Sequence, residues 1–300
     1  MQEYTIEKTS NFGGLEISRS GLRYSGLIAC NDGLCRANSQ NPKENRTIEW
    51  YDKNVLNTMI ENGKINDGSK GGFDDRKLRY DKAEYVNSKS GSTPRLNVHF
   101  GHSNFLEYRE KLGRTKKETE GLTNMGIEHF NDPYAFFPRN PGVTAIIKTN
   151  DKKIIIGQRN VQPDKFEGLL QGAAGHLNFE KNCNNISIIN NMYREVEEET
   201  GVANNSIKYS QFLGLFSDPS VGGDDLDFCY LVDVELPSNY FTQESWKDKV
   251  EKPEHSKFFA IKDYDSLEKL VNIGKLEEEK LDIIFSTRGA LEQLNYNDFK

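Results

Sequence analysis

Hydrophobic and polar positions follow a regular pattern in the second half of the chain. Aliphatic residues fill segments 143–149 and 153–158, and Asn150 and Asp151 separate the two segments. This pattern predicts two strands joined in a hairpin. Strand-like segments return at 211–216, 226–235 and 257–261, and two helices are expected at about 264–272 and 276–295.

A helix is predicted at about 187–200. Four apolar residues form a stripe that stays within about 60° of Met192 on a helical wheel; they are Ile188, Ile189, Met192 and Val196. Asn185 or Ser187 can cap the start of this helix. Gly201 stands where a helix commonly ends with a left-handed residue.

The first half is less regular. Residues 48–61 could form a helix, residues 77–85 and 95–100 alternate well enough for two strands, and Ser103 can cap a helix that runs to about residue 112. Segment 131–142 contains Pro133, Pro138 and Pro141, and neither a helix nor a strand passes easily through it. We therefore expect a domain boundary there, with domains at 1–138 and 139–300.

Composition narrows the class of protein. Charged residues make up 28% of the 300 residues, the mean hydropathy is −0.73 and the formal net charge is −7. These values predict a soluble protein, and the negative charge disfavours general nucleic-acid binding. The sequence also contains no apolar run long enough to cross a membrane. The first ten residues lack the basic and apolar parts of a signal peptide, so we expect a cytoplasmic location. The four cysteines form no CxxC pair and are expected to be free thiols.

Three acidic residues stand along one edge of the predicted helix. Glu195, Glu198 and Glu199 occupy positions i, i+3 and i+4, whereas Glu197 points towards solvent. A hard divalent cation such as Mg²⁺ would neutralise such carboxylates. A solvated acidic face is the alternative. The preceding Arg194, the following Gly201 and the glycine-rich segment 172–175 favour the metal.

These residues resemble the Nudix box, G-x5-E-x7-R-E-U-x-E-E-x-G-U, where U is aliphatic. The second half matches at Arg194, Glu195, Val196, Glu198, Glu199, Gly201 and Val202. The first half departs from the pattern. Eighteen residues separate Gly175 from Arg194, where the pattern has 13, and Glu180 comes one position early. We interpret this difference as a five-residue insertion before the helix.

The resemblance implies an α/β (α+β) fold, a Nudix α/β/α sandwich with a smaller mixed N-terminal domain. It implies Mg²⁺, with Mn²⁺ as a possible substitute, on Glu195, Glu198 and Glu199. Glu198 and Glu199 are candidate catalytic acids, and Arg194 is expected to hold a ligand glutamate by an ion pair. The proton acceptor would be one of these acids or a residue of a later loop, such as Asp224 or Asp225, which could equally be turn residues.

Further residues are candidates for substrate binding. Arg159 could reach a phosphate or form a surface salt bridge. Gly175 and His176 belong to the box, and Asp224 precedes a strand. His176 and His255 are single histidines, which are more often structural or exposed than catalytic.

A narrower similarity links the chain to Nudix-type UDP-glucose and UDP-galactose hydrolases, which carry an N-terminal accessory domain. The similar segments are RLNVHFGHSNFLEYREKLG at 95–113, NDPYAFFPRNPGVTA at 131–145 and PEHSKFFAI at 253–261. This similarity implies cleavage of a nucleotide sugar to UMP and a sugar 1-phosphate, by a monomer or homodimer. Two alternatives stay open: a Nudix hydrolase of ADP-ribose, a dinucleotide or a nucleoside triphosphate, and an inactive Nudix-fold ligand sensor.

Overall fold

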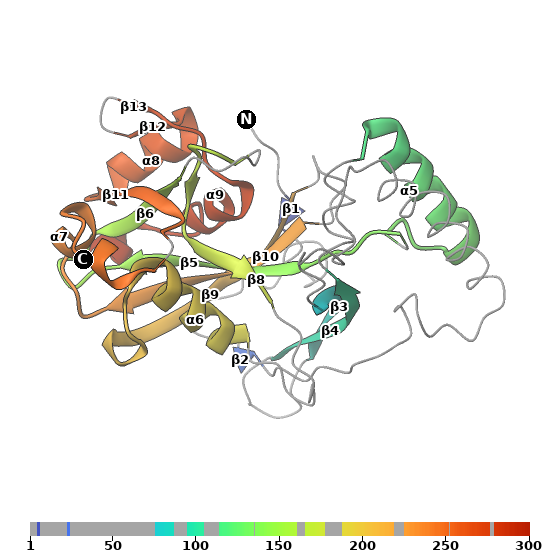
Figure 1. Cartoon of the computed structure of the whole chain (residues 1–300), viewed down its shortest axis with the longest axis horizontal. Helices are drawn as coiled ribbons and strands as arrows, with labels where there is room; N and C mark the ends of the chain where they lie inside the picture. The colour runs from blue at the N-terminus through green and yellow to red at the C-terminus, as the bar shows by residue number, and fades with distance from the viewer. Residues whose placement is uncertain are drawn as a thin grey trace. The chain divides into compact units, whose positions relative to one another are not determined.

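The computed structural model describes residues 5–6, 23–24, 76–86, 95–104, 114–134, 136–160, 166–177, 188–218, 225–251, 253–276 and 279–300. The chain divides into two compact units (Figure 1). The C-terminal unit comprises 1–22, 142–175 and 187–300, and the N-terminal unit comprises 23–141 and 176–186. The expected domain division at 138/139 stays a prediction. The predicted helix at 48–61 lies outside the described residues.

An eight-stranded sheet forms the centre of the C-terminal unit among the described residues. Its order is β1-β9-β10-β5-β6-β11, with β7 paired to β6 and β8 paired to β5. The strands are β1 (Thr5–Ile6), β5 (Pro141–Lys148), β6 (Ile154–Arg159), β7 (Leu170–Gln171), β8 (Ala173–His176), β9 (Ile207–Asp218), β10 (Asp225–Val234) and β11 (His255–Ile261). The five strands predicted in this region are confirmed, with β9 longer than expected.

Helices pack on both faces of this sheet. On one face, α8 (Tyr264–Ile273) and α9 (Phe285–Leu291) share a core with alternate strand residues such as Ile154 and Ile156. Within the described residues this core takes nothing from α6 (Ile188–Thr200), which buries Ile188, Met192 and Val196 elsewhere. Alternation directs successive strand residues to opposite faces, so α6 covers the other one. The mixed α/β class is therefore confirmed.

The C-terminal end of α6 is fixed by its neighbours. Gly201 has a φ of 66°, the left-handed conformation predicted for it. The hydroxyl of Tyr240, in α7 (Asn239–Thr242), donates to the carbonyl of Thr200 over 3.0 Å. Short 3-10 helices follow α6 and α7 at Asn204–Ser206 and Lys247–Lys249. The helix predicted at 187–200 is thus confirmed. Gly201 and Tyr240 fix its position at the C-terminal end.

The single helix predicted at 276–295 is wrong. Gly274, with a φ of 64°, ends α8, and β12 (Lys275–Leu276) pairs with β13 (Glu279–Lys280). The chain then stays extended, because Ile283 forms a parallel bridge with Leu170. Only α9 and the 3-10 helix Tyr296–Phe299 are helical beyond this point. Pairing with the main sheet has overridden local helix propensity here.

The N-terminal unit contains a three-stranded sheet in the order β2-β4-β3. The long pair β3 (Arg76–Val86) and β4 (Arg95–Asn104) is antiparallel, which confirms the two predicted strands, and β2 (Arg23–Tyr24) is parallel to β4. The helix start predicted at Ser103 is wrong, because β4 runs through this residue. An unpredicted helix, α5 (Lys116–Phe130), begins with a capping box between Thr115 and Glu118.

The proline-rich segment after α5 is held by arginine side chains. Arg79 donates to the carbonyls of Phe137 and Tyr134 over 3.1 and 2.8 Å. The Arg139 guanidinium lies over the rings of Tyr80 and Tyr134, at 4.7 and 4.2 Å from their centroids. The bonds from Arg79 supply partners for two carbonyl groups of this segment, and the cation–π contacts of Arg139 pack it against Tyr80.

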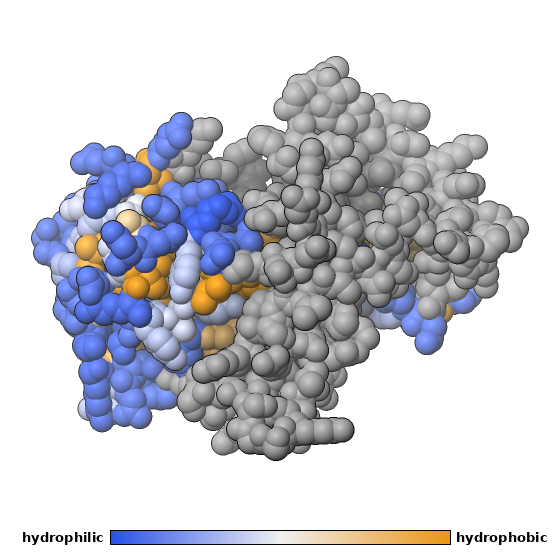
Figure 2. All heavy atoms as spheres, turned by 90° about the horizontal axis from the view of Figure 1, so that it is seen from below, coloured by the Kyte–Doolittle hydropathy of each residue, from blue (hydrophilic) through white to orange (hydrophobic). Residues whose placement is uncertain are grey.

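Hydrophilic side chains predominate on the described part of the face shown in Figure 2, with smaller apolar patches between them. Such a surface agrees with the charged fraction of 28%. None of the helices in the described part of the chain has the length and apolar character needed to cross a bilayer.

Candidate functional site

The predicted acids of α6 divide into a buried pair and an exposed pair. The side chains of Glu195 and Glu199 are 11% and 5% exposed, whereas that of Glu198 is 55% exposed. Glu197 is exposed, as predicted. Because the apolar stripe of α6 faces the sheet, the residues at its edge are carried partly into the interior. A fully solvated acidic face is therefore not what the fold produces.

Arg194 joins two of these acids. Its Nη2 lies 2.6 Å from Glu195 Oε1, and its Nη1 lies 2.9 Å from Glu198 Oε2. The predicted ion pair between Arg194 and a neighbouring glutamate is thus confirmed. A planar guanidinium with two separate donors fixes the carboxylates more closely than a lysine would.

The glycine-rich segment lies directly against the buried pair. The backbone N–H of Ala174 donates to Glu199 Oε2 over 3.1 Å. A Cβ at position 175 would overlap the carboxyl group of Glu195, so a side chain here would displace that carboxyl group. The structure therefore brings Gly175 to the acids of α6. His176, also a candidate, ends β8 and is half-buried.

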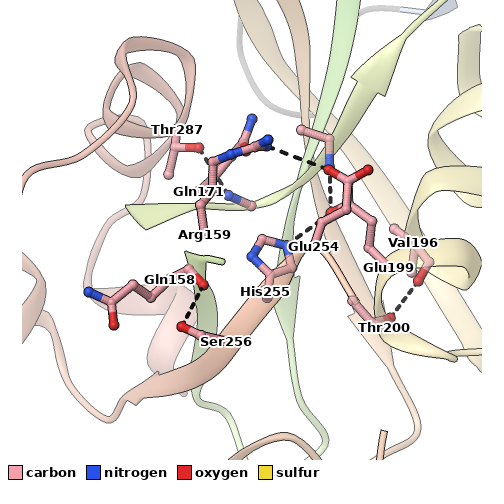
Figure 3. Close-up of polar contacts among 12 residues, drawn as sticks. Gln158, Arg159, Gln171, Val196, Glu199, Thr200, Glu254, His255, Ser256 and Thr287 are labelled. Atoms are coloured by element: carbon pink, nitrogen blue, oxygen red, sulfur yellow. Dashed lines mark hydrogen bonds and ion pairs between the residues drawn. The ribbon is translucent and has the colours of Figure 1, made fainter. Parts of the chain in front are cut away.

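His255, on the edge strand β11, contacts the carboxylate of Glu199. Its Nε2 lies 2.9 Å from Glu199 Oε2, and the side chain is completely buried (Figure 3). The sequence favoured a structural or exposed position for His255. The structure places it in the interior, in contact with Glu199, a candidate catalytic acid. Its partner could not be read from the sequence, because the two residues are 56 positions apart.

Arg159 stands beside this pair in the sheet. Its backbone is paired with that of His255, and its Nη1 lies 2.6 Å from Gln171 Oε1 and 3.6 Å from Glu254 Oε2. The Arg159 side chain is 14% exposed and that of Glu254 is 45% exposed, so the structure contains the salt bridge considered as an alternative, and phosphate binding by Arg159 stays a prediction. Neither Gln171 nor Glu254 was expected from the sequence. The segment PEHS at 253–256 was the available signal, since Glu254 and His255 are its central residues.

The electrostatic environment disfavours charge on both buried acids. Burial raises the pKa of Glu195 to about 7, although Arg194 opposes the shift. Burial also raises the pKa of Glu199 well above its usual range, and the negative charge of Glu254 adds to this effect. Burial, followed by the charge of Arg159, lowers the pKa of His255 to about 4, so this ring is neutral at pH 7.

The donor chemistry of the site fits a hard cation. Burial is the main cause of the raised pKa values of Glu195 and Glu199, and a bound cation would favour their ionised forms. Carboxylate oxygens suit Mg²⁺ or Mn²⁺. Among the described residues, however, no three Asp, Glu, His or Cys side chains converge on one metal position. The carboxylate of Glu198 is instead paired with Arg194. Asp224 and Glu180 lie outside the described residues, and Asp225 begins β10.

No family model matches the chain, and no curated protein matches it. Among solved structures, the Nudix domain of Shewanella oneidensis NrtR complexed with ADP ribose is 18% identical, with 60% of this chain and 96% of that chain covered and a TM-score of 0.36. A MutT Nudix hydrolase from Burkholderia pseudomallei is 20% identical, with coverages of 52% and 98% and a TM-score of 0.35. A Nudix hydrolase from Nitrosomonas europaea is 23% identical, with coverages of 41% and 71% and a TM-score of 0.29. These TM-scores are below 0.5, so the likenesses do not by themselves establish a shared fold.

Proposed function

We propose that the protein is a metal-dependent Nudix-type hydrolase that cleaves the pyrophosphate of a nucleoside diphosphate derivative. The observation that carries this proposal is the buried pair Glu195 and Glu199, two carboxyl groups on one helix edge whose ionised forms a bound cation would stabilise. The match of this helix to the second half of the Nudix box supports it. Isolated acids that served only for solubility would remain in solvent, as Glu197 does.

Glu195 and Glu199 would hold Mg²⁺ or Mn²⁺, and Glu198 would join them only by giving up its ion pair with Arg194. A bound cation would screen the negative charge of the pyrophosphate and lower the pKa of a bound water. The proposed ligand set thus keeps all three acids of the helix.

The remaining residues orient the site. Arg194 holds the Glu195 carboxylate in place through its 2.6 Å ion pair. Arg159, which Gln171 and Glu254 hold beside Glu199, supplies a cation for a phosphate group. The proton of the attacking water passes to one of the α6 carboxylates or to Asp224.

The proposed substrate class is a UDP-sugar such as UDP-glucose or UDP-galactose. Support comes from the three segments similar to UDP-sugar hydrolases, one of which contains β11 and the preceding Glu254. Water would attack one phosphorus and the P–O–P bond would break, which yields UMP and a sugar 1-phosphate.

The test is phosphate release, coupled through a phosphatase, from UDP-sugars, ADP-ribose, dinucleotides and nucleoside triphosphates in the presence of Mg²⁺. Glu199→Gln should lower turnover by more than about 100-fold, beyond the usual cost of losing a residue that only supports a metal ligand. Glu197→Gln, on the exposed side of the same helix, should leave turnover unchanged. Preference for ADP-ribose would refute the proposed UDP-sugar substrate but agree with the proposed metal site. No turnover with Mg²⁺ or Mn²⁺ would refute the enzyme proposal and favour a ligand sensor.

A further inference from the structure

His255 is placed to fix the orientation of one carboxylate in the proposed metal site. We propose that His255 is a positioning residue, which holds Glu199 Oε2 through its Nε2–H and so presents Oε1 to the cation. This inference rests on the proposed function. It concerns a residue that would not itself touch metal or substrate.

Two donors meet at the same carboxylate oxygen. Glu199 Oε2 lies 3.1 Å from the backbone nitrogen of Ala174 and 2.9 Å from His255 Nε2. An ionised carboxylate can only accept hydrogen bonds, so the proton must be on Nε2 of the histidine when Glu199 binds a cation. With Oε2 occupied in this way, Oε1 is the oxygen left for the metal.

The surroundings of the ring favour this same tautomer. Among the described residues, Nδ1 of His255 has no hydrogen-bond partner. Nδ1 is without a partner within the described part of the chain in either tautomer, so the contact at Nε2 decides between them. A proton on Nε2 donates to Glu199 Oε2, whereas a proton on Nδ1 would leave two acceptors facing each other at 2.9 Å.

The ring also has little freedom to turn. It is 1% exposed, and a Cβ on the facing Gly157 would overlap it. The ring of Phe258 lies against another side, with centroids 4.8 Å apart. A donor locked by packing holds its acceptor more accurately than a mobile one, which is what a metal ligand needs.

If the contact were purely structural, His255 would only connect α6 to the edge of the sheet, and its loss would lower stability without a specific loss of metal affinity. The chain contains a matched structural contact, because Tyr193 Oη lies 2.9 Å from Ser210 Oγ and joins α6 to β9. Tyr193→Phe removes this second contact between helix and sheet without changing any acid.

The experiment measures Mn²⁺ binding to the full chain by electron paramagnetic resonance. We compare the wild type with His255→Phe, His255→Gln and Tyr193→Phe, and follow urea unfolding of each in parallel. His255→Phe should weaken Mn²⁺ binding by about 10- to 100-fold, the usual cost of losing a residue that supports a metal ligand. His255→Gln keeps a donor near the position of Nε2 and should restore most of the affinity. Tyr193→Phe should lower stability but not affinity.

Three outcomes would overturn the inference. One is equal Mn²⁺ affinity in the wild type and His255→Phe, and another is an equal loss of affinity in Tyr193→Phe. The third is a wild type that binds no Mn²⁺, which would also refute the proposed function; the first two leave that function standing. If His255→Phe does not fold, His255→Asn replaces it. Its shorter amide cannot reach Oε2, so the same loss of affinity is expected.

Discussion

Replacing Glu195 with glutamine should stabilise the metal-free protein. Burial raises the pKa of Glu195 from 4.5 to about 7. Each pKa unit corresponds to about 1.4 kcal/mol, so ionisation of this carboxyl costs about 3 kcal/mol more in the folded chain than in the unfolded chain. Glutamine has nearly the same shape and can accept the hydrogen bond from Arg194, but it carries no charge that must be buried.

The pH dependence has a definite sign. Because the pKa is raised in the folded state, the folded chain binds more protons than the unfolded chain between pH 4.5 and about 7. The stability of the wild type therefore falls as the pH rises through this window and stays low above it. Glu195→Gln lacks this loss. We expect it to be more stable than the wild type by about 3 kcal/mol near pH 8 and equally stable near pH 4.

The assay is urea unfolding in EDTA, followed by the fluorescence of the buried Trp246 in a Trp50→Phe background. Glu197→Gln is the matched control, because this exposed residue should change stability by less than about 0.5 kcal/mol at either pH. A Glu195→Gln variant that is no more stable than the wild type near pH 8 would refute the reasoning, as would a gain that persists near pH 4. Added Mg²⁺ should stabilise the wild type more than the variant.

Three further predictions concern single residues. Burial raises the pKa of the Cys229 thiol well above its usual range, so this thiol should react with a disulfide reagent at pH 8 only after unfolding, as mass spectrometry of the labelled peptide would show. Asp263 accepts a hydrogen bond from the backbone of Ser266 at the start of α8, and Asp263→Ala should cost about 1 kcal/mol in urea unfolding at pH 7. Hydrogen bonds from the side chain and then the backbone of Ser266 lower the pKa of Asp263, so this stabilisation should disappear as the pH falls below the range where the carboxyl is ionised. Gly175→Ala should displace the carboxyl group of Glu195 and lower turnover while circular dichroism stays unchanged; full turnover would contradict the close approach seen here.

Elements with a strong local pattern could be predicted from the sequence. The stripe of Ile188, Met192 and Val196 indicated α6, and aliphatic runs indicated β5 and β6. The helix α5 was missed because, among those of its side chains that the structure describes, Leu122 is the main buried apolar one, which is too little for a periodic signal. Its capping box at Thr115 was the available clue.

The candidate site could be predicted only where its residues lie on one helix. Spacing alone placed Glu195 and Glu199 on one edge of α6. Which of the acids would be buried depends on how that helix packs against the sheet. The contact from His255 depends on strand order, since β11 must first pair with β6. Pairing between distant segments is set by the whole fold, so no local pattern contains it.

The fixed C-terminal end of α6 also determines where the chain can change in length. Tyr240 and Gly201 hold the last turn, so the rotational phase of the helix is counted backwards from Thr200. One residue inserted between Glu195 and Glu199 would rotate one acid by about 100° relative to the other and separate the pair. Residues added before Ile188 leave this phase unchanged. The extra length between Gly175 and Arg194, relative to the Nudix pattern, is therefore of the kind that the site should tolerate.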